Sequence, residues 1–75
     1  MMNTTAKVRE WIERVRPGCF VYADEMLVIE NAHRAFVDAG HECSPSEFRF
    51  ALHCLGLKVE PHTGGCRLVL DHKVA

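Results

Sequence analysis

The sequence lacks an excess of positive charge. Its nine lysines and arginines stand against ten acidic residues, so the formal net charge at pH 7 is -1. Proteins that bind nucleic acid usually carry a basic excess that neutralises phosphate groups. A basic surface can therefore form on this chain only if the fold brings the basic residues together on one face. The five histidines add positive charge only as the pH falls through about 6.5.

Long apolar runs are also missing. No stretch approaches the roughly 20 apolar residues that a membrane-spanning helix needs. The first five residues lack the charged and then apolar pattern of a signal peptide. We therefore expect a cytoplasmic protein that makes no membrane contact, in which the four cysteines are reduced.

The sequence contains no motif for catalysis or metal binding. None of the close pairs typical of zinc sites occurs among the cysteines, which are Cys19, Cys43, Cys54 and Cys66. His41-x-Cys43 with His53-Cys54 is the nearest approach to a ligand cluster. A nucleophile motif and a phosphate-binding loop are absent as well. We expect no enzyme activity, no metal and no cofactor.

What the sequence does contain is the composition of one small folded domain. Apolar residues make up 48% of the chain and charged residues 25%, close to the average of globular proteins. A chain of 75 residues cannot support two hydrophobic cores. We expect a single domain over residues 1–75, with an ordered core over about residues 5–71.

The first part of the chain predicts a helix followed by one short strand. Apolar residues recur at helical spacing from Thr4 or Thr5 to about Arg16. A threonine can cap the start of this helix, and Pro17-Gly18 ends it. The segment 19–23, with β-branched and aromatic residues, then predicts a single strand.

Two further helices are predicted after this strand. Asp24 suits the N-cap of a helix that ends at Gly40. Ser44, Pro45 and Glu47 open the next helix, over 45–55, as a cap, a first-turn proline and the acid of a capping box. The side chains expected to enter the core from this helix are Phe48, Ala51, Leu52 and Leu55.

The end of the chain predicts a hairpin. Segments 57–60 and 66–70 alternate enough to be strands, and 61–65 between them contains two glycines that allow positive-φ turn angles. A hairpin by itself would be marginal, so we expect the early strand to pair with it. If the early strand pairs with the last one, Cys19 and Cys66 become cross-strand neighbours.

This order of elements, α-β-α-α-β-β, is that of a winged helix-turn-helix, an α+β fold with three helices and a small three-stranded antiparallel sheet. The positions that carry a family pattern are Trp11, Phe36, Gly40, Ser44, Ser46, Phe48, Leu52 and Gly64-Gly65. With them the chain resembles winged-helix domains of the regulatory-factor-X type and the C-terminal winged helix of phage and poxvirus primase-helicases. The resemblance implies DNA binding, although the wing keeps only Arg67 of the family's arginines.

The residues predict where double-stranded DNA would bind. The second helix of a helix-turn-helix lies in the major groove, and the outer face of the helix 45–55 carries Ser46, Arg49, Phe50 and His53. Arginine can pair with guanine, and an apolar ring can touch a thymine methyl group. The expected phosphate contacts are Arg34, Lys58, His62, Thr63, Arg67 and the amides of Gly64-Gly65, within a wing over 60–67.

The leading hypothesis is therefore a small DNA-binding protein, a regulator or replication accessory of phage or mobile-element type. Because the charge predicts weak binding by a monomer, we expect a homodimer that engages two half-sites. Trp11 and the first helix, or the edge of the wing, would supply the dimer contact.

An alternative hypothesis rests on the same face. An exposed Phe50 beside Arg49 and His53 has the composition of a protein-binding hot spot, and Glu42 and Glu47 nearby disfavour DNA. The alternative is a winged-helix protein-interaction module, such as a phage-encoded inhibitor of a host protein or defence complex.

Overall fold

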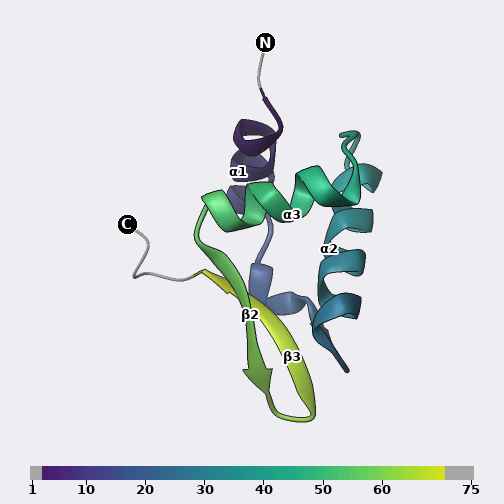
Figure 1. Cartoon of the computed structure of the whole chain (residues 1–75), viewed down its shortest axis with the longest axis vertical. Helices are drawn as coiled ribbons and strands as arrows, with labels where there is room; N and C mark the ends of the chain where they lie inside the picture. The colour runs from purple at the N-terminus through teal and green to yellow at the C-terminus, as the bar shows by residue number, and fades with distance from the viewer. Residues whose placement is uncertain (1–2, 71–75) are drawn as a thin grey trace.

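The structure is a computed structural model that describes residues 3–70, and Figure 1 shows its elements. In chain order these are α1 (Thr4–Arg14), the 3-10 turn η1 (Pro17–Cys19), β1 (Val21–Tyr22), α2 (Glu25–Asp38), α3 (Pro45–Cys54), β2 (Leu57–His62) and β3 (Gly65–Leu70). The strands form one antiparallel sheet in the order β1-β3-β2. The predicted α+β arrangement is confirmed. The predicted end of the core at residue 71 lies outside the described residues.

Helix α1 begins and ends differently from the prediction. Its N-cap is Asn3 and not a threonine: the Asn3 side chain accepts a hydrogen bond from the Ala6 N–H at 2.8 Å. Asparagine is the better capping residue of the two. The helix ends at Arg14 because Val15 is already extended. None of the helices within residues 3–70 is long and apolar enough to cross a membrane.

Strand β1 is shorter than the predicted segment 19–23. The chain winds into the 3-10 turn η1 first, where the Phe20 N–H donates to the Pro17 carbonyl at 3.0 Å. The predicted pairing with the hairpin is confirmed: β1 pairs with β3, in a register that places Tyr22 opposite Cys66. The expectation that Cys19 faces Cys66 is therefore wrong, because Cys19 belongs to the turn.

The helix-turn-helix caps agree with the sequence. The Asp24 carboxylate accepts from the Leu27 N–H at 2.9 Å. Gly40 follows α2 with a φ of 101°, a left-handed conformation that glycine adopts without steric cost. The predicted capping box at the start of α3 is also present, with the Glu47 N–H donating to the Ser44 hydroxyl at 3.1 Å.

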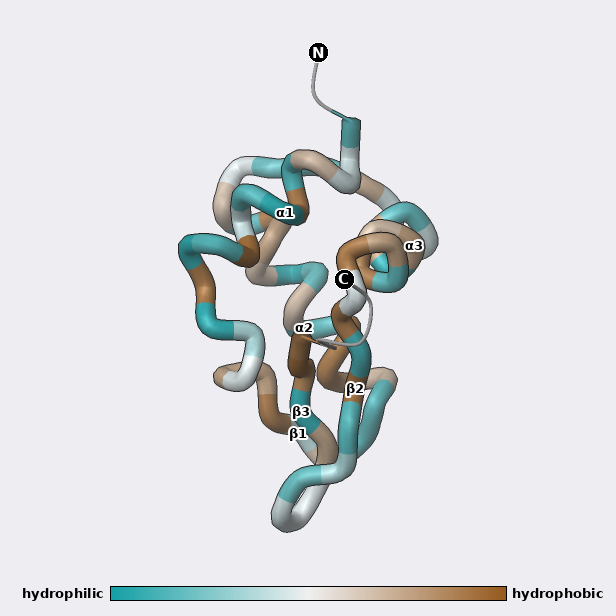
Figure 2. The backbone as a smooth tube through the Cα atoms, turned by 90° about the vertical axis from the view of Figure 1, so that its left-hand side faces the viewer, coloured by the Kyte–Doolittle hydropathy of each residue, from teal (hydrophilic) through white to brown (hydrophobic). Residues whose placement is uncertain are grey.

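The turn of the hairpin is shorter than predicted. Pro61 and His62 belong to β2 and Gly65 belongs to β3, so only Thr63 and Gly64 form the turn in place of the predicted loop 61–65. Gly64 supplies the one positive φ that this turn uses, 78°. The hairpin projects below the helices in Figure 1, and its free end is hydrophilic to neutral in Figure 2.

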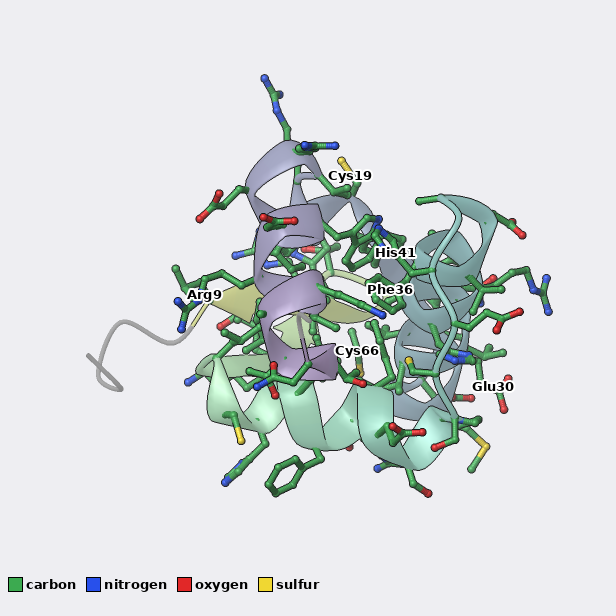
Figure 3. All side chains as sticks on the ribbon, turned by 90° about the horizontal axis from the view of Figure 1, so that it is seen from above. Arg9, Cys19, Glu30, Phe36, His41 and Cys66 are labelled. Atoms are coloured by element: carbon green, nitrogen blue, oxygen red, sulfur yellow. The ribbon has the colours of Figure 1, made fainter. Side chains whose placement is uncertain are left out.

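The core is built around Trp11. Its ring meets the rings of Phe36 and Phe48 edge-on, at centroid distances of 5.5 and 6.0 Å. Figure 3 shows Phe36 pointing from α2 toward α1, with the ring of His41 stacked on it at 4.5 Å. Trp11 is only 5% exposed. It therefore cannot supply the surface contact of a homodimer that the sequence suggested for it.

Replacing Gly65 by alanine tests the close approach of β3 to β1. A Cβ at Gly65 would clash with the carbonyl oxygen of Tyr22, and the atoms nearest to it all belong to the backbone of Tyr22 and Ala23, so they cannot rotate away as a side chain could. We expect Gly65→Ala to lower the free energy of unfolding by about 1–3 kcal/mol, as overpacking does. Urea denaturation followed by Trp11 fluorescence measures this change.

Gly18→Ala is the matched control. A Cβ at Gly18, which lies in the neighbouring turn η1, meets nothing within 4 Å. This variant should be as stable as the wild type. Equal stability losses in the two variants would contradict the packing described for Gly65.

Candidate nucleic-acid interface

The outer face of α3 brings together the four residues predicted to contact base edges. Ser46, Arg49, Phe50 and His53 are all exposed, whereas Phe48, Ala51 and Leu52 face the core. Phe50 is 66% exposed, an unusual state for an aromatic side chain of this size. In Figure 1, α3 lies across the front of the molecule, above the hairpin. The helix therefore presents one continuous polar and aromatic face.

Glu47, the acidic residue of α3, is held by groups at the start of the helix. Its carboxylate accepts hydrogen bonds from the Ser44 N–H at 3.2 Å and from the Thr4 hydroxyl of α1 at 3.4 Å. The backbone hydrogen bond from Ser44 is the main reason that the pKa of Glu47 lies below its ordinary value. Glu47 therefore points toward α1, which leaves the outer face of α3 without an acidic side chain.

Two grooves lie on the side of α3 that faces α2. The first, of about 490 Å³, lies between α2 and α3, with an apolar wall formed by Met26, Ile29 and Val37. The second, of about 370 Å³, lies between α2, α3 and the hairpin. Arg49 lines both grooves. It is thus the central cation of this surface.

The charges that line the grooves are of both signs. Arg34 joins Arg49 at the first groove, and Lys58 joins it at the second. Glu30 lines the first groove and Glu25 the second, so each groove also holds an acid. Arg49 forms no ion pair with an acidic side chain of residues 3–70, so its charge remains available to a ligand.

The hairpin holds the other predicted phosphate contacts. His62 and Thr63 are exposed at its free end. Arg67 is different: its guanidinium donates from Nε and Nη2 to the Glu60 carboxylate at 3.0 and 2.8 Å. These two residues are cross-strand partners. Because the sequence does not show the register, it could not reveal that Glu60 offsets the one arginine of the wing.

The sequence reasoning also missed part of this surface on α2. Leu27 of α2 is 37% exposed, and Met26, Ile29 and Val37 form an apolar stripe along the groove. Their spacing of three and eight residues places them near one side of a helix. This spacing could have predicted the apolar stripe from the sequence. The half-buried His33 lies between them and bonds through Nε2 with the Cys43 carbonyl oxygen at 2.8 Å, which fixes the turn between α2 and α3.

Among residues 3–70, no group of three or more His, Cys, Asp or Glu side chains is placed to hold a metal ion. Comparisons with protein-family models, curated proteins and solved structures gave no match. The resemblance to regulatory-factor-X and primase-helicase winged helices therefore stays a prediction from the sequence.

The anchoring of Glu47 predicts a pH-dependent stability. Because its folded-state pKa is lowered, the carboxylate stabilises the fold above the unfolded-state pKa, and this stabilisation is lost as the pH falls through the folded-state pKa. Glu47→Gln should therefore be less stable than the wild type at neutral pH, and the difference should shrink below about pH 4. Urea-unfolding midpoints measured across this range check it. A difference that stayed constant down to about pH 3 would show that the charge has no such role.

Proposed function

We propose that this chain binds double-stranded DNA, with α3 in the major groove and the hairpin β2–β3 beside the phosphate backbone. The observation that carries the proposal is the exposed face of Ser46, Arg49, Phe50 and His53, from which Glu47 is turned away. The second helix of a helix-turn-helix presents its side chains to base edges in this way. Catalysis is not required of any of these residues.

Each side chain of the face has a role that its chemistry suits. Arg49 has the planar fork that pairs with guanine, and the ring of Phe50 suits a thymine methyl group. Ser46 and His53 can bond base edges or phosphate oxygens. Such a protein would serve as a regulator or replication accessory, and we retain the expectation of a phage or mobile-element source from the sequence resemblance.

The charge distribution predicts modest affinity. Arg34, Lys58, His62 and Thr63 lie where phosphate groups would pass, but Glu25 and Glu30 line the same grooves. If Arg34 and Arg49 neutralise about two phosphates, the logarithm of the binding constant falls with the logarithm of salt concentration at a slope of about -2. Binding is therefore best measured at low salt.

Arg49→Ala is the direct test of the DNA-reading face. We expect it to weaken binding to a random duplex pool by about tenfold or more at low salt, since a bidentate arginine–base pair is worth about 1–3 kcal/mol. Fluorescence anisotropy measures the affinity.

Arg9→Ala is its matched control, because it removes the same charge from an exposed residue of α1 that lines neither of the grooves lined by Arg49. This variant should bind nearly as well as the wild type. No binding at low salt, or equal losses in both variants, would refute the proposal.

Glu60→Gln tests whether the wing takes part. This change releases Arg67 from its ion pair, so the affinity for DNA should rise and the salt slope should steepen by about 0.9. Glu13→Gln, which makes the same charge change on α1, controls for the change in net charge. If the two variants had equal effects, the hairpin would not contact DNA.

A second candidate function is binding of another protein through the same face. The 66% exposure of Phe50 beside an apolar groove of about 490 Å³ favours it, because aromatic anchors and adjoining pockets typify protein-binding hot spots. An inhibitor of a host protein or defence complex would fit this description. Capture of a defined partner by the wild type but not by Phe50→Ala, together with no DNA binding at low salt, would favour this candidate.

A further inference from the structure

The groove between α2 and α3 holds two arginines that have no acidic partner. Arg34 lines it from α2 and Arg49 from α3, so each wall supplies one. Neither guanidinium forms an ion pair with an acidic side chain of residues 3–70. Glu30 is the one acid among the lining residues, so the lining is net positive on a chain whose formal net charge is -1. Charge complementarity therefore calls for an acidic ligand.

Most of the other residues that line this groove are apolar. Met26, Ile29 and Val37 belong to α2, and Pro45 begins α3. Met26 is 65% exposed and Val37 is 38% exposed, so the apolar stripe is open to a ligand. Exposed apolar surface of this kind marks an interaction site. The ligand must therefore offer apolar groups together with its acids.

The length and the exposure of the groove suit a helix better than a small molecule. The lining runs from Met26 to Val37, which is about 16 Å, or three turns, along α2. Sites for small molecules bury roughly 70–90% of the ligand, whereas walls as exposed as these would leave much of a small molecule in water. An amphipathic helix of similar length lays its apolar face along such a groove.

We infer that this groove binds an acidic amphipathic helix of a partner protein. The apolar face of that helix lies against Met26, Ile29 and Val37. Its carboxylates pair with Arg34 and Arg49, because the planar guanidinium matches a carboxylate with two hydrogen bonds. Since the two arginines come from different walls, the partner helix carries acids on both sides of its apolar stripe. The phosphates of DNA suit the same arginines but offer no apolar group to the stripe, which favours a protein.

The partner helix and DNA would share one residue. Arg49 lines the groove and also belongs to the α3 face that we propose contacts DNA. Binding of the acidic helix should therefore lower the affinity for DNA. Only this consequence depends on the proposed DNA binding, because the ligand of the groove follows from the lining alone.

Fluorescence anisotropy of a labelled synthetic peptide, titrated with the whole chain, tests the inference. The probe is a helix-forming peptide of about 15 residues, with leucines at i, i+4, i+7 and i+11 and glutamates on both sides of this stripe. The same peptide with glutamine in place of glutamate should bind at least about tenfold more weakly, because it offers no charge to the two arginines. A reductant is present because Cys19 and Cys54 are free and exposed.

Substitutions on the two parts of the groove separate charge from apolar contact. Arg34→Ala should weaken binding of the glutamate peptide by about twofold to fivefold and leave that of the glutamine peptide nearly unchanged. Met26→Asp should weaken binding of the glutamate peptide by at least about tenfold. Arg9→Ala and Val21→Asp are the matched controls, since both residues are exposed and line neither groove beside α3. Both controls should bind like the wild type, and circular dichroism confirms that each variant is folded.

The outcomes separate this inference from the DNA-binding proposal. Binding of the glutamate peptide that Met26→Asp and Arg34→Ala weaken, and that the controls retain, supports the inference even if no DNA binds. No binding up to about 1 mM, equal binding of the two peptides, or equal losses in the control variants overturns it even if DNA binds. Amide NMR signals of Met26 and Val37 that shift with a short duplex but not with the peptide would assign the groove to nucleic acid and overturn it as well.

Discussion

The contact of Trp11 with Phe36 and Phe48 is the interaction on which the rest of the structure depends. One residue comes from each of the three helices, and the two phenylalanines are fully buried. The edge-on ring contacts at 5.5 and 6.0 Å fix how the helices lie against one another. Leu68 of β3 packs in the same core, so the core also fixes the position of the sheet.

The candidate interface follows from this core. Once Phe48, Ala51 and Leu52 face inward, the helical repeat turns Arg49 and Phe50 outward. The capping box that starts α3 also holds its acid, Glu47, toward α1. The residues that cap the helix therefore also hold its one acidic side chain away from the outer face. The outer face of α3 thus lacks negative charge, although the chain as a whole has no basic excess.

Local signals in the sequence were sufficient to predict the helices, the caps at Asp24 and Ser44, the order of the elements and the exposed face of α3. They failed where the outcome depends on contacts between distant segments. Tyr22 rather than Cys19 faces Cys66, because the winding of η1 decides the register of β1. The pairing of Arg67 with Glu60 and the apolar groove beside α3 also depend on tertiary packing, so one sequence does not reveal them.

We propose that the outer face of α3 is the surface that contacts DNA. Amide NMR spectra recorded while a short duplex is added at low salt test this proposal, because they report the affected residues without any substitution. We expect shift changes over 46–53 and at the free end of the hairpin over 62–65, with residues 9–14 of α1 unaffected. Changes confined to α1, or no changes at all, would contradict it.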